Sequence, residues 1–191
     1  PAPAQDAGAE KITPYIPEAF EGISFTPANP CVLLSQDIHS PAAEEYRKLK
    51  TAVLRLTKGE FRNLIMVTSP LSGEGKSITA ANLAIVMAQA GLRTILVDAD
   101  LRRSTLHQIF KVDNEIGLAD LLTSQKLRTT DCLIKTEVEN LRLITSGKRI
   151  ANTTERLGTR RLSQLVTELK NAADVVIFDS PPALLVADTS L

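Results

Sequence analysis

The sequence predicts an α/β fold in which a parallel β-sheet is flanked by helices. From Asn63 onward, apolar runs such as "LIMVTS", "RTILVD", "LRLIT" and "VVIFD" alternate with helical patterns. Runs that are apolar throughout suit strands covered on both faces, and the intervening helices supply the crossovers of a parallel sheet. A second observation is the glycine-containing loop "SPLSGEGKS", which joins the first run to an alanine-rich helical stretch.

The N-terminal part of the chain has a different composition. Six of the ten prolines, at positions 1, 3, 14, 17, 27 and 30, lie in the first thirty residues, where apolar pieces are short. Such a segment is typical of an extended arm or linker. We therefore expect a proline-rich arm over residues 1–34 and one P-loop-like folded domain over residues 35–191.

A helix is predicted from Ser40 to about Lys58, ahead of Gly59. Ser40 can cap the helix and Pro41 suits its first position. The spacing of three and four residues places an apolar group on one face: Tyr46, Leu49, Val53 and Leu56. A neighbouring polar face carries Glu44, Arg47 and Lys50.

Composition limits the possible functions. The 22 basic and 22 acidic residues cancel, which gives no reason to expect a nucleic-acid partner. Cys31 and Cys132 lack metal-binding spacing, and with only two histidines a zinc site has few ligands. Both cysteines are expected to be small buried residues in a reducing compartment. No apolar stretch is long enough to span a bilayer and no export signal is present, so we expect a cytoplasmic location.

The glycine loop predicts a phosphate site. A loop that leaves a strand and enters a helix turns backbone N–H groups inward, and the helix start adds partial positive charge. Gly73 and Gly75 permit backbone conformations that a side chain would forbid, Lys76 can reach terminal phosphates, and the Ser77 hydroxyl can ligate Mg²⁺. Pro70 stands where the usual pattern opens with a glycine, which indicates a variant family. The predicted nucleotide-binding residues are Ser72, Gly73, Glu74, Gly75, Lys76, Ser77 and Ile78.

Aspartates at two strand ends point to the same site. "TILVDAD" carries Asp98 and Asp100, and "VVIFDSPP" carries Asp179. In parallel sheets, ligands bind beyond the carboxyl ends of the strands, where these side chains and the glycine loop would meet. Carboxylates there can organise Mg²⁺ or accept the proton of an attacking hydroxyl. Each aspartate alone could instead be a helix cap or a solvated loop acid.

Together these segments resemble the cytoplasmic catalytic domain of the bacterial tyrosine kinases of exopolysaccharide synthesis. The resemblance is carried by "SPLSGEGKS", "ILVDADLRRSTLHQIF" and "VVIFDSPPALLVAD", with "EEYRKLKTAVL" ahead of them, and it covers about Ser35 to the end. It implies a Walker A loop at Gly73 to Ser77, a second motif at Asp98 and Asp100, and a Walker B aspartate at Asp179.

The resemblance also implies the chemistry. The nucleotide in that family is ATP with Mg²⁺, which Ser77, Asp98 and Asp179 would organise, while Asp98 or Asp100 would assist a tyrosine hydroxyl. The implied catalytic residues are Lys76, Asp98, Asp100 and Asp179. The implied function is an ATP-dependent protein-tyrosine autokinase that regulates exopolysaccharide chain length.

Partners follow from the same resemblance. Glu44, Arg47 and Lys50 match a helix motif through which subunits of the family contact one another, with lysine where arginine is usual, a change that loses bidentate pairing. A membrane-spanning chain-length regulator, fused or separate, would hold the domain at the inner face of the plasma membrane.

Two features depart from the family pattern. The family phosphorylates a tyrosine cluster in a C-terminal tail, whereas the only tyrosines here are Tyr15 and Tyr46. Relatives also continue past the segment that carries Asp179, so we expect the C-terminal part of the domain, with the acceptor tyrosines, beyond Leu191.

Two other functions remain open. One is a regulatory ATPase that resembles the partition and septum-placement ATPases. Those proteins usually carry an extra lysine early in the glycine loop, whereas Pro70, Leu71 and Ser72 stand there in this chain. The other is a nonenzymatic module that binds nucleotide and signals to a membrane partner, which would not need all the aspartates.

Overall fold

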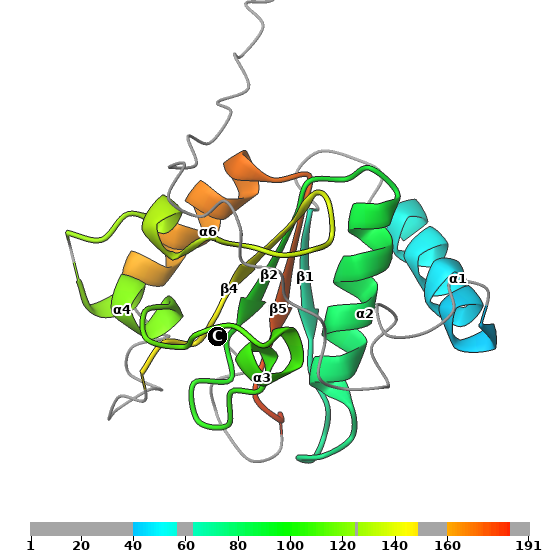
Figure 1. Ribbon diagram of the computed structural model, residues 1–191, viewed down its shortest axis with the longest axis horizontal. Coiled ribbons are helices and arrows are strands. Elements are labelled where there is room, and N and C mark those ends of the chain that lie inside the picture. Colours follow the sequence, from blue (N-terminus) through cyan, green and yellow to red (C-terminus); the bar gives the residue numbers. More distant parts are fainter. Residues whose placement is uncertain (1–39, 57–62, 125, 149–159, 184–191) are drawn as a thin grey trace, which may run out of the picture.

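A twisted β-sheet forms the centre of the computed structural model, which describes residues 40–56, 63–124, 126–148 and 160–183 (Figure 1). The predicted arm over residues 1–34 lies outside the described residues. Within the described part, the strand order is β1-β5-β2-β4-β3. The strands are β1 (Leu64–Val67), β2 (Thr94–Asp98), β3 (Ile134–Lys135), β4 (Leu141–Ile144) and β5 (Val175–Asp179).

The sheet is parallel except at one edge. β1 pairs with β5, β5 with β2 and β2 with β4, all in parallel, whereas β3 pairs antiparallel with β4. The expectation of a parallel sheet is therefore confirmed for β1, β2, β4 and β5, whereas the short antiparallel strand β3 was not predicted. The connection from Lys135 to Leu141 is too short for a helical crossover, so the chain must return as a hairpin.

Helices cover both faces of the sheet, as Figure 1 shows. On one face, α2 (Lys76–Gln89) packs on the sheet and α1 (Pro41–Leu56) packs on α2. On the other face lie α4 (Leu118–Thr123), the 3₁₀ turn η3 (Thr129–Cys132) and α6 (Arg160–Ala172). The short helix α3 (Leu106–Phe110) follows β2. Two buried apolar clusters, one on each side of the sheet, make this a three-layer α/β/α arrangement.

The alanine-rich sequence of α2 matches its position between α1 and the sheet. Every residue from Ala80 to Ala88 is buried, so this helix has no solvent-facing stripe over that stretch. A helix that is apolar all round belongs in an interior layer, and alanine side chains let both neighbours approach closely.

The outer helix α1 begins as predicted. Its first helical residue is Pro41, and the Ser40 hydroxyl accepts a hydrogen bond from the Ala43 N–H at 3.3 Å. Tyr46 and Val53 pack against the core, but Leu49 is 39% exposed and Leu56 is 75% exposed. The predicted apolar face is therefore wrong for these two leucines, because α1 packs mainly on α2 and buries only a narrow stripe.

Cys132 is buried in the second cluster, as expected, and burial raises the pKa of its thiol to about 12. Cys31 lies outside the described residues. Among the helices that the structure describes, none combines the length and apolar character needed to cross a membrane.

Candidate nucleotide-binding site

The glycine loop occupies the turn between β1 and α2. Gly73 and Gly75 adopt left-handed backbone angles, with φ of 85° and 84°, and an added Cβ would meet no atom within 4 Å at either position. Glycine is therefore required by the backbone conformation and not by crowding. Gly75 caps α2 without any side-chain hydrogen bond to the first turn, so backbone N–H groups at the start of α2 can receive an anion.

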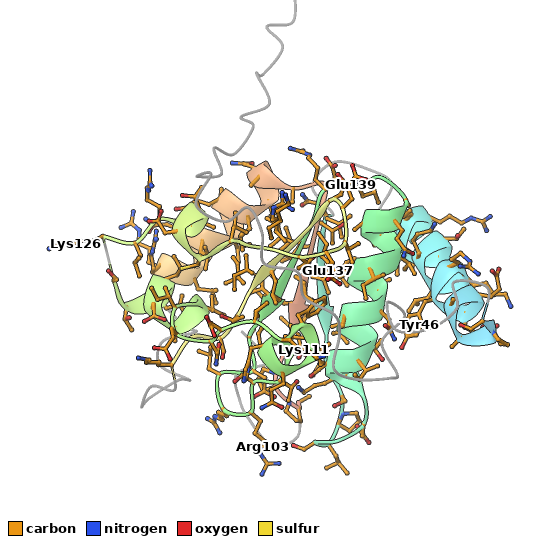
Figure 2. All side chains as sticks on the ribbon, viewed as in Figure 1. Tyr46, Arg103, Lys111, Lys126, Glu137 and Glu139 are labelled. Carbon is orange, nitrogen blue, oxygen red and sulfur yellow. The ribbon has the colours of Figure 1, made fainter. Side chains whose placement is uncertain are left out.

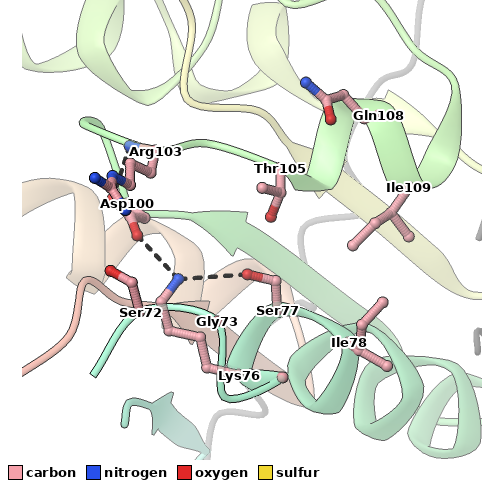
Figure 3. A pocket seen from close by; sticks show the side chains of 11 residues that line it. Ser72, Gly73, Lys76, Ser77, Ile78, Asp100, Arg103, Thr105, Gln108 and Ile109 are labelled. Atoms are coloured by element: carbon pink, nitrogen blue, oxygen red, sulfur yellow. Dashed lines mark hydrogen bonds and ion pairs between the residues drawn. The ribbon is translucent and has the colours of Figure 1, made fainter. Parts of the chain in front are cut away.

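A cavity of about 580 Å³ opens against this loop (Figure 3). Its lining comes from the glycine loop, the start of α2, the segment after β2, and α3. The lining residues are Ser72, Gly73, Gly75, Lys76, Ser77, Ile78, Asp100, Arg103, Thr105, Gln108 and Ile109.

Lys76 connects the loop to the strand ends. Its Nζ lies 2.9 Å from Asp100 Oδ2 and 3.5 Å from Asp179 Oδ1, and its side chain is only 8% exposed. Burial disfavours the charged form of Lys76. The carboxylates of Asp179 and Asp100 outweigh that effect, so the pKa of the ammonium lies above its ordinary value. The lysine is therefore a buried cation held between two acids at the floor of the cavity.

Asp98 lies beneath the cavity at the end of β2. Its Oδ2 accepts hydrogen bonds from the backbone N–H groups of Thr105 and Leu106, at 3.2 and 3.1 Å. Its Oδ1 is buried and has no hydrogen-bond partner in the described part of the chain. Burial, followed by repulsion from Asp179, raises the pKa of Asp98 to about 8.

Asp179 occupies the matching position at the end of β5, where it is in register with Asp98. Its side chain is fully buried, and neither of its oxygens accepts a well-formed hydrogen bond from the described residues. Burial raises the pKa of Asp179, although the nearby Ser77 hydroxyl and the Lys76 ammonium oppose this rise. Buried carboxylate oxygens without partners are the kind of atom for which a cation or its water ligands would be a natural partner.

These donors fit Mg²⁺ that is shared with a nucleotide. Ser77, Asp98 and Asp179 offer hard oxygen atoms close to a phosphate-binding loop, which is the chemistry that Mg²⁺ prefers. No group of three or more carboxylate, histidine or cysteine side chains among the described residues could hold a metal ion by itself. A magnesium ion here would therefore depend on phosphate oxygens and water for most of its ligands.

The structure brings most of the predicted site residues together. Asp98 and Asp179 lie below the lining, and the other predicted residues line the cavity with the exception of Glu74. The Glu74 side chain is exposed and accepts a hydrogen bond from the Leu71 N–H at 3.0 Å, which ties the loop to itself. The Glu74 side chain therefore does not line the cavity, while its backbone is part of the glycine loop.

Sequence reasoning missed the wall opposite the loop. Arg103, Thr105, Gln108 and Ile109 come from α3 and the segment before it. The Asp100 carboxylate fixes that segment by accepting a hydrogen bond from the Arg103 N–H at 3.0 Å. The segment "ILVDADLRRSTLHQIF" contains all four residues. However, α3 has only five residues and is too short to produce a periodic pattern, so the sequence does not predict it as a helix.

A strand, a glycine loop and a helix, with a buried lysine facing aspartates at neighbouring parallel strand ends, define a P-loop nucleotide-binding protein. The sequence matches the family model described as the AAA domain over residues 62–191. The chain belongs to this family, and within it to the bacterial tyrosine kinases.

Three known proteins illustrate this assignment. Tyrosine-protein kinase YwqD of Bacillus subtilis is 38% identical over 149 residues, which cover 78% of this chain and 62% of that protein. The kinase domain of Escherichia coli tyrosine kinase ETK superposes with a TM-score of 0.77 at 32% identity, covering 83% of this chain and 62% of that one. The septum site-determining protein MinD of Pyrococcus horikoshii, solved with Mg-ADP, reaches 0.54 at 26% identity, covering 63% of this chain and 49% of that one. The chain thus spans about three fifths of the length of its curated kinase relative.

Proposed function

We propose that this chain binds ATP with Mg²⁺ at the cavity beside the glycine loop and transfers the terminal phosphoryl group to a tyrosine hydroxyl. The observation that carries the proposal is Lys76, buried between Asp100 and Asp179 at the floor of the cavity beside the glycine loop. To contact a phosphate, the Lys76 ammonium must leave one of these two carboxylates. Nucleotide binding would therefore rearrange the ion pairs of the site.

The residues divide the work as follows. Lys76 and the loop N–H groups hold the phosphates, while Ser77, Asp98 and Asp179 hold the metal ion. Bound Mg²⁺ supplies positive charge that stabilises the transferring phosphoryl group. Asp100 lines the cavity and is released when Lys76 turns to the phosphate. Its carboxylate then accepts the proton of the tyrosine hydroxyl, whose ordinary pKa is about 10.

A regulatory ATPase without kinase activity is the second candidate. The same fold in the MinD structure with Mg-ADP favours nucleotide binding for either candidate. Pro70, Leu71 and Ser72 occupy the loop positions where such ATPases usually carry a second lysine, so this chain offers no cation there for a partner's phosphates. Its much closer likeness to kinase domains favours phosphoryl transfer to protein.

The direct test is mass spectrometry of the full-length protein after incubation with ATP and Mg²⁺. We expect phosphate on tyrosine, with turnover that depends on Mg²⁺. ATP hydrolysis without phosphotyrosine, or phosphate found chiefly on serine, would assign the protein to the regulatory ATPases.

The acceptor is expected to be a tyrosine presented by another subunit, in a segment outside these 191 residues. Tyr46 is half-buried against α2, where a cavity on another subunit could not readily reach it (Figure 2). Tyr15 lies outside the described residues and is at most a minor acceptor.

The family resemblance also supports a membrane-spanning chain-length regulator as partner, with this domain on the cytoplasmic side of the membrane.

We also propose self-association through α1. Glu44 and Arg47 form an ion pair with each other at 2.9 Å, with side chains 53% and 37% exposed, and Lys50 is half-buried. An exposed pair at this spacing contributes only about 0.3–0.5 kcal/mol, so its loss within one subunit would have little effect. Contacts in a ring would run head to tail, with α1 of one subunit facing its neighbour.

Exchanging the two charges tests this interface. The double variant Glu44→Arg, Arg47→Glu keeps an ion pair within the helix but reverses both charges toward a partner. We expect the assembly to dissociate in analytical ultracentrifugation while the thermal unfolding temperature stays within about 2 °C. If the sedimentation of the variant equals that of the wild type, the Glu44–Arg47 pair makes no contact between subunits and acts only within α1. Exchanging Glu45 and Lys48, a second exposed pair on α1 at 2.8 Å, provides the matched control.

A further inference from the structure

Thr105 stands between the end of β2 and the start of α3, on the cavity wall opposite the glycine loop. Its hydroxyl oxygen is buried and has no hydrogen-bond partner among the described residues. Leaving a buried hydroxyl without a partner costs about 1–3 kcal/mol, so such an atom calls for an explanation. Figure 3 shows this hydroxyl directed toward the side of the cavity that Lys76 and Ser77 form.

The backbone explains why the hydroxyl is available. A threonine that precedes a helix usually turns its hydroxyl back to accept a hydrogen bond from the first turn. Thr105 makes no such bond. Instead, the Asp98 carboxylate from β2 accepts the N–H groups of Thr105 and Leu106. The Gln108 N–H, which a capping hydroxyl could accept, bonds to the Thr105 carbonyl at 3.1 Å. The hydroxyl therefore has no capping role and is available to another partner.

The surroundings indicate which partner the hydroxyl would meet. Across the cavity, Lys76 is the cation that reaches the terminal phosphates in a loop of this type. A threonine hydroxyl can donate a hydrogen bond, and a phosphate oxygen is a strong acceptor. The wall residue and the loop lysine thus face the same space from opposite sides, as a clamp on a phosphate group would require.

We propose that the Thr105 hydroxyl donates a hydrogen bond to the terminal phosphate of a bound nucleoside triphosphate. The proposal rests on the nucleotide site described above and deepens it. Because a nucleoside diphosphate lacks that phosphate, Thr105 distinguishes the two nucleotides. It is a positioning residue, and through Asp98 it is also tied to the end of β2.

Equilibrium binding to the full-length protein tests this role without any need for turnover. The probes are ADP with Mg²⁺ and an ATP analogue whose β–γ bridge cannot be hydrolysed, also with Mg²⁺. Thr105→Val removes the hydroxyl but keeps the shape, and Thr105→Ser restores the hydroxyl. Thr167→Val makes the same change on the exposed surface of α6, where the hydroxyl donates a hydrogen bond to the Ser163 carbonyl.

We expect Thr105→Val to weaken binding of the analogue about tenfold, which is the size of one hydrogen bond to a charged group. Binding of ADP should change less than twofold, and Thr105→Ser should bind the analogue like the wild type. Equal losses for both nucleotides, or no loss for either, would overturn the proposal. A Thr105→Ser variant as weak as Thr105→Val would do the same. If the wild-type protein bound neither probe, the nucleotide site itself would be refuted.

Discussion

Replacing Lys76 by methionine is expected to abolish nucleotide binding and also to destabilise the protein. Methionine keeps most of the bulk but removes the cation that lies 2.9 Å from Asp100 and 3.5 Å from Asp179. Removing one member of a buried ion pair leaves a buried charge without compensation, which typically costs 3–5 kcal/mol. We expect a loss near the lower end, about 3 kcal/mol, because burial already raises the pKa of Asp179, which can therefore take up a proton.

The two consequences of this change can be separated. Adding Asp100→Asn to Lys76→Met removes one of the orphaned charges and should recover part of the lost stability in urea unfolding. Nucleotide affinity should stay lost, because no cation reaches the phosphates. Lys126→Met, on an exposed side chain that points away from the body in Figure 2, should leave both quantities unchanged. Wild-type ATP affinity in Lys76→Met would contradict the assignment of the loop.

The sequence predicts those parts of the structure that are encoded by a short stretch of neighbouring residues. The strands β1, β2 and β5 and the helix α2 are local patterns, namely continuous apolar runs and an alanine-rich segment, and all four appear where expected. The convergence of Asp98, Asp100 and Asp179 also follows from local information, because parallel strands end at a common edge.

Other features depend on tertiary contacts that no local pattern encodes. β3 is two residues long, and its direction is set by the hairpin that follows it. Leu56 has helical spacing, but whether it is buried depends on how far α2 extends beside it. The sequence presents Thr105 as an ordinary helix cap, and only the fold shows that its hydroxyl makes no cap bond and that the residue lines the cavity.

Replacing Asp98 by asparagine is expected to have opposite effects on activity and on stability. Turnover should fall about 10²–10³-fold, since the proposed metal ligand loses its charged oxygen. Stability without nucleotide and metal should rise near pH 8. The asparagine oxygen can still accept the Thr105 and Leu106 N–H groups, while a neutral amide replaces a carboxylate that burial and Asp179 disfavour.

The pH dependence fixes the sign of the stability change. The pKa of Asp98 is about 8 in the folded protein, and that of an unfolded aspartate is near 4. Between these values Asp98 is protonated in the folded state and ionised in the unfolded state, so the folded state binds more protons. The unfolding free energy of the wild type therefore falls as pH rises. The asparagine variant lacks this loss, so its advantage in unfolding free energy should be small at pH 5 and grow toward pH 8. Asp113→Asn, at an exposed position, is the matched control for the loss of one carboxyl group. An advantage that shrinks with rising pH would mean that Asp98 is held as a stabilised anion, since only a depressed folded-state pKa reverses the slope.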